Sequence, residues 1–476
     1  MNILQVTNPR TGENDYHIPE HDRAHVARSA AELRTAQKAW KDAGLAYRCE
    51  VMGKWRQAIE KHSEAISAAL CIDTGRQLMS QIETSGVIQR IEYCRRRAPE
   101  ILAQPAAATS VMVPSVSFKH NLVPYPVVGV ISPWNFPLTL ALIDTIPALL
   151  AGCSVLLKPS EITPRFAEPL MKTLQEVPEL QSVLSIVNGG ADTGMALIDN
   201  VDAICFTGSV MTGRKVAIQA AQNFIPAFLE LGGKDAAIVL KSADLENAAT
   251  AILRSAAGMT GQACQSLERI YVQHDVFAGF LELLIAKAKR IRINFPDINE
   301  GQIGPFIFPD QAQKVSEQLR DAIAHGAKIH CGGDVQELDG GWYCLPTVIT
   351  GVSQDMLLMQ EETFGPILPV MPFDETEQAI AMANDSDFGL SGAVFAGNRE
   401  EGEVVARQII AGAISINDAS LTGMANDVEK NSFCLSGIGG SRMGDQGFLR
   451  FFRKQAIMYQ SEPAASLEIF DESHAG

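Results

Sequence analysis

The feature that most constrains the fold of this 476-residue chain is a repeated alternation of short apolar runs with helix-like stretches. A first series of apolar runs, each followed by a helical pattern, lies at 154–157, 183–187, 203–206 and 236–240. A second series lies at 269–272, 365–370, 390–395 and 413–416, and its helical stretches lie at 276–291, 309–325 and 375–384. Strand, helix and strand in succession are typical of a parallel sheet covered by helices. Two α/β units in series are therefore predicted, with a boundary near 230–234.

The flanking regions have other patterns. Apolar residues recur at helical spacing over 20–72 and 80–103, which predicts helices there. Between 109 and 131, β-branched residues interrupted by prolines predict strands. The most apolar stretch, 139–157, contains an aspartate and a proline, which favours buried core over a membrane span. The acidic segment 461–476 is expected to be loose.

Charge and cysteine content argue against several classes of protein. The chain has 39 Lys and Arg against 55 Asp and Glu, a formal charge of −16. Such a surface repels nucleic acid and anionic membranes, so neither is an expected partner. Nine cysteines without a Cys-x-x-Cys pair indicate free thiols in a reducing compartment, and no metal site is predicted. The first residues lack the pattern of a secretion signal, so a cytoplasmic location is expected.

One cysteine stands in a segment suited to catalysis. Cys264 lies in the segment 258–266, where glycines and small polar residues can hold a thiol beside a ligand and leave a backbone N–H free. The alternative is an inert buried cysteine.

Two further segments carry candidate catalytic groups. Glu230, followed by two glycines, can approach a substrate at the end of a strand, or else it lies in an ordinary turn and faces solvent. Asn135 is fixed between Pro133 and Pro137, where its amide is a candidate donor to an oxyanion. Its alternative role is to cap a helix.

Two strand ends have the character of a dinucleotide site. The segment 158–161, Lys-Pro-Ser-Glu, places a lysine and a carboxylate where ribose hydroxyls bind in dinucleotide folds. The segment 206–209, Phe-Thr-Gly-Ser, suits a turn into a helix N-terminus, which attracts a pyrophosphate. The usual G-x-G-x-x-G fingerprint is missing here.

Together, in this order, these segments resemble the aldehyde dehydrogenase superfamily along nearly the whole chain. Cys264 follows Glu230 by 34 positions, which matches the family's spacing of nucleophile and base. The segment 361–366, Glu-Glu-Thr-Phe-Gly-Pro, matches the family's acidic Phe-Gly-Pro segment, and Asn417 matches the Asn that ends another strand. The resemblance implies an α/β fold with a Rossmann-type nucleotide-binding domain, an α/β catalytic domain and a small β excursion for oligomerisation.

The resemblance also implies domain limits. The nucleotide-binding domain is expected at 1–105 and 126–232, the catalytic domain at 233–433, and a return segment at 434–452. The excursion at 106–125 is expected to pair with 453–462 and to build a homodimer or homotetramer, and 463–476 forms the tail. Exposed strand edges favour self-association as well. Val111, Val113 and Val116 are accordingly expected to be buried only in the oligomer.

By resemblance, the reaction is the oxidation of an aldehyde to a carboxylic acid. The Cys264 thiolate attacks the aldehyde carbon to give a thiohemiacetal, whose oxyanion is held by the Asn135 side chain and the Cys264 backbone N–H. Hydride passes to a nicotinamide and leaves a thioester, which water hydrolyses with Glu230 as the base. Because acylating members that use coenzyme A lack this glutamate, its presence favours water as acceptor.

The cofactor implied is NAD, with NADP possible, and Glu161 favours NAD because a carboxylate repels a 2′-phosphate. The residues expected to contact it are Ser132, Pro133, Trp134, Lys158, Ser160, Glu161, Phe206, Gly208, Ser209, Leu231, Gly232, Glu362 and Phe364. The substrate pocket is expected to be lined by Phe136, Leu140, Ile143, Gly258, Met259 and Gln265. Most of these pocket residues are apolar, so the resemblance and composition favour a hydrophobic or aromatic aldehyde.

One segment departs from the family pattern. Most members have a Pro-Phe-Gly-Gly stretch near the C-terminus, where this chain reads Asn-Ser-Phe-Cys-Leu-Ser-Gly at 431–437. The path of the loop 418–447, near the substrate mouth in relatives, is therefore left open. Three alternatives remain: a coenzyme A-acylating semialdehyde dehydrogenase, a thiol hydrolase of activated esters, and a non-catalytic protein on the same fold.

Overall fold

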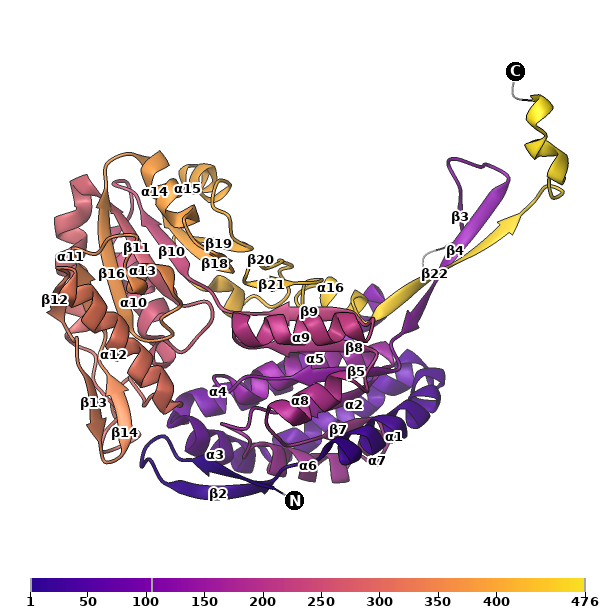
Figure 1. Cartoon of the computed structure of the whole chain (residues 1–476), viewed down its shortest axis with the longest axis horizontal. Helices are drawn as coiled ribbons and strands as arrows, with labels where there is room; N and C mark the ends of the chain where they lie inside the picture. The colour runs from indigo at the N-terminus through magenta and orange to yellow at the C-terminus, as the bar shows by residue number, and fades with distance from the viewer. Residues whose placement is uncertain (1, 104–105, 475–476) are drawn as a thin grey trace.

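The computed structural model describes residues 2–103 and 106–474. Its first large sheet has the strand order β21-β9-β8-β5-β6-β7, and only β21 runs antiparallel to its neighbour. The strands are β5 (Val127–Ile131), β6 (Ser154–Lys158), β7 (Leu184–Ile186), β8 (Ala203–Thr207), β9 (Ala227–Glu230) and β21 (Gly437–Ile438). Helices cover both faces of this sheet (Figure 1). The predicted runs at 154–157, 183–187 and 203–206 are thus confirmed as strands.

Two separate apolar cores lie on the two faces of this sheet. The helices are α1 (Arg23–Asp42), α2 (Gly44–Lys61), α3 (Ser63–Thr74), α4 (Gln77–Ile101), α5 (Pro137–Ala151), α6 (Ala167–Gln175), α7 (Pro178–Gln181), α8 (Ala191–Ile198), α9 (Val210–Gln222) and α16 (Gln446–Leu449). Side chains of Asp22 and Ser209 accept hydrogen bonds from backbone N–H groups at the starts of α1 and α9. Gly75, in the left-handed conformation, ends α3.

The core helix α5 shows how a charge is accommodated in the most apolar stretch. Asp144 is fully buried there and accepts from Arg442 at 2.7 Å, and Arg450 is its second partner. Although burial alone would raise the pKa of Asp144, the two arginines hold it below its usual value. This ion cluster ties the C-terminal return segment to the first sheet. No helix in the described part of the chain is both long enough and apolar enough to cross a bilayer.

The second large sheet has the order β12-β15-β16-β11-β10-β18-β19, in which only β12 runs antiparallel to its neighbour. Its strands are β10 (Asp235–Val239), β11 (Leu267–Gln273), β12 (Lys328–Cys331), β15 (Thr347–Thr350), β16 (Ile367–Phe373), β18 (Ser391–Phe395) and β19 (Ala413–Ile416). The covering helices are α10 (Leu245–Ala257), α11 (His274–Ala288), α12 (Pro309–Ala324), α13 (Leu357–Gln360), α14 (Thr376–Asn384) and α15 (Arg399–Ala406). A core lies on each face, so the second predicted α/β unit is confirmed.

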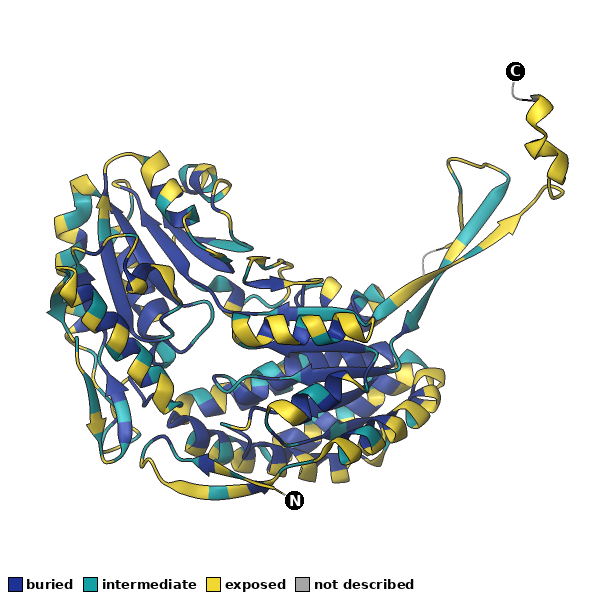
Figure 2. Ribbon diagram, in the orientation of Figure 1, coloured by how far each residue is buried: buried dark blue, intermediate teal, exposed yellow. Residues whose placement is uncertain are grey.

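A third, three-stranded sheet extends away from the body of the molecule (Figure 1). In it β22 (Phe452–Gln460) runs antiparallel to β4 (Val116–Pro124), which also pairs with the short β3 (Ala108–Thr109). Figure 2 shows exposed and half-buried residues along these strands. The prediction that Val111 and Val113 belong to strands is wrong: both lie in the connection between β3 and β4, where Val111 is 96% exposed. Beyond β22, the described tail forms two short 3-10 turns, the exposed Leu467–Phe470 and then Glu472–His474.

Three two-stranded pairings complete the fold and were not predicted. They are β1 (Ile3–Thr7) with β2 (Asn14–Pro19), β13 (Val335–Leu338) with β14 (Gly341–Cys344), and β17 (Phe388–Gly389) with β20 (Phe433–Cys434). The last pair fastens the segment that departs from the family pattern to β17, which directly precedes β18 of the second sheet, while β21 fastens it to the first sheet. The departing segment therefore bridges the two sheets.

Candidate active site

Asn135 lies where the first α/β unit meets the second. It stands between the end of β5 and the start of α5, and only 3% of it is exposed. Its Nδ2 donates to the carbonyl of Gln262 at 3.0 Å, and its own carbonyl accepts from Arg76 Nη2 at 2.6 Å. The alternative that Asn135 caps a helix is wrong, because Phe136 occupies the N-cap position of α5 and makes no side-chain cap. The amide retains a second N–H with no acceptor among the described residues.

The segment that carries Cys264 connects α10 to β11. A 3-10 turn, Gly258–Gly261, contains left-handed backbone at Met259 and Thr260. The Gln262 side chain holds this segment, because its Nε2 donates to the carbonyls of Met259 and Pro305 and its Oε1 accepts from Ile307 N at 2.9 Å. The Cys264 segment is therefore fixed by side-chain bonds to backbone.

The Cys264 thiol is half-buried in the resting protein. Burial raises its pKa to about 12, and the nearby carboxylates Asp235, Glu362 and Glu230 act in the same direction. Lys430 is the cation that opposes this rise. Because the thiolate is the nucleophilic form, the cysteine must lose its proton before it can react.

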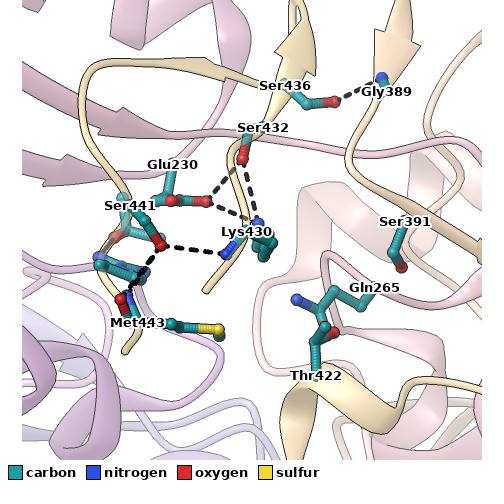
Figure 3. Close-up of polar contacts among 12 residues, drawn as sticks. Glu230, Gln265, Gly389, Ser391, Thr422, Lys430, Ser432, Ser436, Ser441 and Met443 are labelled. Atoms are coloured by element: carbon teal, nitrogen blue, oxygen red, sulfur yellow. Dashed lines mark hydrogen bonds and ion pairs between the residues drawn. The ribbon is translucent and has the colours of Figure 1, made fainter. Parts of the chain in front are cut away.

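Glu230 is the last residue of β9, and its carboxylate faces the departing segment (Figure 3). Its Oε2 accepts from Ser432 Oγ at 2.8 Å and from Lys430 Nζ at 3.2 Å, and Lys430 Nζ also donates to Ser432 Oγ at 3.1 Å. The side chain is only 12% exposed, so the alternative of a turn with a solvated glutamate is wrong. β21 holds the segment in place by pairing Gly437 with Glu230.

The two glycines that follow Leu231 allow this segment to approach the Cys264 backbone and the Glu362 carboxylate closely. A Cβ at Gly232 would lie 2.6 Å from Glu362 Oε1, and a Cβ at Gly233 would lie 2.5 Å from the Cys264 carbonyl oxygen. Gly233 has no room for a side chain, and a side chain at Gly232 would have to displace the Glu362 carboxylate. Gly233 N donates to Glu362 Oε1 at 3.0 Å. The segment 230–234 is thereby held against both the Cys264 segment and Glu362.

A buried ion pair positions the segment that contains Glu362 and Phe364. Glu268 accepts from the backbone N–H groups of Thr363 and Phe364 at 2.7 and 2.8 Å, and from Lys234 Nζ at 2.7 Å. Lys234 Nζ also donates to Thr363 Oγ1 at 2.9 Å. Burial raises the pKa of Glu362 to about 7.

Apart from Glu362 and Phe364, the expected cofactor residues lie at the carboxyl ends of β5, β6, β8 and β9 and in adjoining turns. Lys158 ends β6, and its Nζ donates to Glu161 Oε2 at 3.0 Å. Ser209 caps α9, and the buried Ser132 Oγ has no hydrogen-bond partner in the described part of the chain. The rings of Trp134 and Phe364 meet edge-on, 5.4 Å apart. The carboxyl ends of parallel strands are the usual ligand position in such sheets. Other expected contacts at these strand ends or in the turns are Pro133, Ser160, Phe206, Gly208, Leu231 and Gly232.

The expected substrate residues differ in burial and in polarity. All but one are half-buried, and the exception is the buried Ile143; the half-buried members are Phe136, Leu140, Gly258, Met259 and Gln265. Gln265 Oε1 accepts from Thr422 Oγ1 at 2.6 Å, and its carbonyl accepts from Ser420 Oγ at 2.9 Å. Ser420 and Thr422, in the loop 418–447, thus place polar groups beside the residue that follows Cys264.

Several residues of the site were missed by the sequence analysis. They are Arg76 and Gln262 around Asn135, Lys234 and Glu268 behind Glu362, and Lys430 and Ser432 beside Glu230. Gln262 and Lys234 lie within or beside motifs already singled out, so their positions were a usable signal. Lys430 had no such signal, because about 200 residues separate it from Glu230, and Ser432 lies in the segment 431–437, which was singled out only for its departure from the family pattern.

Fold and site together define an α/β protein of dinucleotide-binding topology with Cys264, Glu230 and Asn135 gathered between its two sheets. The sequence model of the aldehyde dehydrogenase family matches residues 2–457, and the chain belongs to that family. It is thus an oxidoreductase that acts on aldehydes.

Three similar proteins illustrate the relationship. The structure of an aldehyde dehydrogenase of Anabaena variabilis is 51% identical, with a TM-score of 0.95, over 98% of this chain and 99% of that one. A succinate-semialdehyde dehydrogenase [NADP(+)] of Mycolicibacterium smegmatis is 33% identical over 94% of this chain and 87% of its own length. A 4,4'-diapolycopene aldehyde oxidase of Methylomonas is 32% identical over 98% of this chain and 86% of its own length.

Proposed function

We propose that this protein oxidises an aldehyde to a carboxylic acid with NAD or NADP, using Cys264 as the nucleophile, Asn135 as an oxyanion donor and Glu230 as the base. The observation that carries the proposal is the convergence of these residues from both α/β units. Two contacts hold these residues together: the hydrogen bond from Asn135 to Gln262 and the close approach of Gly233 to the Cys264 carbonyl.

The residues at the strand ends fit a dinucleotide. The unpartnered buried hydroxyl of Ser132 and the N-terminus of α9 offer polar groups of the kind that bind phosphate and ribose oxygens. Lys158 and Glu161 would hold the adenosine ribose, Ser209 the pyrophosphate, and Glu362 the nicotinamide ribose. When bound, the nicotinamide supplies the acceptor for hydride. The carboxylate of Glu161 favours NAD, because it would repel the additional phosphate of NADP.

The chain's own groups account for the covalent chemistry. The Cys264 sulfur adds to the aldehyde carbon to form a thiohemiacetal, and the free amide N–H of Asn135 stabilises the developing oxyanion. After oxidation the carbon is held as a thioester on Cys264. Glu230 then takes a proton from the water that attacks this thioester, and the acid leaves as the thiol is regenerated.

Two features bear on acceptor and substrate. Glu230 Oε1 receives no hydrogen bond from the described residues, so it is available to a water molecule, which favours hydrolysis over acyl transfer to coenzyme A. The apolar side chains of Phe136, Leu140 and Ile143 support a hydrophobic or aromatic aldehyde. The relatives' names range from succinate semialdehyde to diapolycopene aldehyde, so a panel must include both polar and apolar compounds.

The projecting sheet supports self-association. β4 and β22 present exposed and half-buried faces away from the body of the molecule, and such surfaces favour pairing with another copy. We propose a homodimer or homotetramer that buries Val116 and its neighbours. Sedimentation of a stable monomer would contradict this assembly.

The activity test uses purified protein with aliphatic, aromatic and carboxylated aldehydes, each with NAD or NADP and with or without coenzyme A. NADH or NADPH formation with release of the free acid supports the proposal. Formation of an acyl-coenzyme A product would favour the acylating alternative. Hydrolysis of activated esters without any reduction of cofactor would favour the thiol hydrolase.

A further inference from the structure

Lys430 is a buried lysine that directly precedes the segment 431–437, which departs from the family pattern. Only 3% of its side chain is exposed. Two bonds are made by its ammonium group, to Glu230 Oε2 at 3.2 Å and to Ser432 Oγ at 3.1 Å. Its backbone N–H donates to Ser441 Oγ at 3.3 Å, which fixes the start of the side chain (Figure 3). The ammonium is therefore held at the carboxylate from a well-anchored backbone.

Burying an ammonium group is unfavourable unless a partner compensates for the lost water. Here the compensating carboxylate is Glu230, and the serine hydroxyl completes a closed triangle of three hydrogen bonds. Two of the three hydrogen bonds end on Oε2 of Glu230, and the third joins its two donors, Lys430 and Ser432. Oε2 of Glu230 is thus anchored, whereas Oε1 accepts nothing from the described residues.

We propose that Lys430 is a positioning residue for thioester hydrolysis, which together with Ser432 anchors Oε2 of Glu230 and leaves Oε1 for the attacking water. This rests on the proposed function, in which Glu230 is the base. The anchored carboxylate has one fixed orientation, so the water is held in a defined position at the acyl carbon.

The charges around this pair determine the expected pH dependence. Lys430 is the cation near Cys264, and Arg442 is a cation near Glu230. Asp235 and Glu362 add negative charge near Cys264. A carboxylate that loses a cationic neighbour holds its proton to a higher pH. Without Lys430, the carboxylate of Glu230 would lose its cationic neighbour, and its orientation would no longer be fixed.

The test uses p-nitrophenyl acetate, which needs neither the cofactor nor the natural aldehyde. The Cys264 thiolate attacks the ester carbonyl, the carbon–sulfur bond forms, and p-nitrophenolate leaves as a burst. Water then attacks the acetyl-thioester, Glu230 takes the water proton, and acetate leaves as the thiolate is regenerated. The burst therefore reports acylation, and the steady-state rate reports hydrolysis.

Lys430→Met, Lys430→Arg and the wild type are compared across pH. For Lys430→Met we expect a retained burst, hydrolysis about tenfold slower, and an acidic limb of the hydrolysis rate that lies at higher pH than in the wild type. Lys430→Arg keeps the charge and the donors, so its acidic limb should stay near that of the wild type. Lys328→Met makes the same change at an exposed residue of β12, and it should alter neither the burst nor the hydrolysis rate.

The proposal is overturned if Lys430→Met keeps the wild-type acidic limb and hydrolysis rate, or if Lys430→Arg loses as much as Lys430→Met. A burst of full amplitude shows that a variant is folded. If Lys430→Met gives no burst, Ser432→Ala replaces it, with slower hydrolysis as the supporting result and an unchanged rate as the contrary one. Glu230→Gln tests the proposed function separately, because wild-type hydrolysis in that variant would remove Glu230 from the reaction regardless of Lys430.

Discussion

Replacing Lys234 by methionine removes the ammonium of a fully buried ion pair and keeps the apolar stem of the side chain. Lys234 lies 2.7 Å from Glu268 and 2.9 Å from Thr363 Oγ1, and both its side chain and that of Glu268 are buried. Removal of one partner of such a pair costs about 3–5 kcal/mol, because a buried charge is left uncompensated. Glu268 would keep two backbone donors, so we expect a loss near the lower end of this range.

The same change should weaken cofactor binding. Glu268 holds the backbone N–H groups of Thr363 and Phe364, and this fixes Glu362 between Gly233 and the proposed nicotinamide ribose. A shift of that carboxylate should raise the KM for NAD several-fold. Because Cys264 lies outside the ion pair, its burst with p-nitrophenyl acetate in the absence of cofactor should change less than the KM.

Thermal unfolding and steady-state kinetics measure the two effects. For a chain of this length that unfolds as one unit, a loss of about 3 kcal/mol corresponds to a midpoint lower by about 3 °C. Lys172→Met, which breaks an exposed ion pair with Glu168, is the matched control and should barely move the midpoint. Adding Glu268→Gln to Lys234→Met should recover part of the loss. A Lys234→Met midpoint within about 1 °C of the wild type, with an unchanged KM for NAD, would refute the reasoning.

Three further outcomes follow from the site. Asn135→Ala should lower kcat by about 10²- to 10³-fold, since it removes an oxyanion donor, and near-normal kcat in steady-state assays would contradict that role. Gly233→Ala should abolish activity or folding, as judged by turnover and circular dichroism, because its methyl group would collide with the Cys264 carbonyl. Alkylation of Cys264 by iodoacetamide in the cofactor-free protein should accelerate about tenfold per pH unit between pH 7 and pH 10, because its pKa is raised to about 12 and the thiolate fraction grows with pH. A rate that levels off below pH 8 would contradict this.

Local sequence was enough to predict most strands of the two large sheets, although β9, β12, β15 and β21 were not predicted. Strands such as β6 and β8 are buried on both faces, and continuous apolar runs record that environment directly. The hairpin of β1 and β2 was missed because only one residue in each strand is buried, so neither strand has an apolar run. Val111 and Val113 misled the strand prediction because β-branched residues are also found in exposed connections.

The catalytic residues of the candidate site were predictable because they lie in short sequence motifs. Cys264, Glu230 and Asn135 stand in segments whose glycines and prolines fix the backbone locally. Lys430 lies beside Glu230 because the two strands that follow it, β20 and β21, pair with β17 and β9. Both partner strands are far away in the sequence. Contacts of this kind have no local signature, which is why the lysine beside the base was missed.

The central claim is that Cys264 is the nucleophile of an aldehyde oxidation. Its most direct test is NADH or NADPH formation from the best aldehyde by the wild type, Cys264→Ala and Cys331→Ala. Cys331 is also a half-buried cysteine, but it lies on β12, outside the site, and serves as the matched control. The account predicts a loss of about 10³-fold or more in Cys264→Ala and near wild-type turnover in Cys331→Ala. Substantial turnover by folded Cys264→Ala would contradict it.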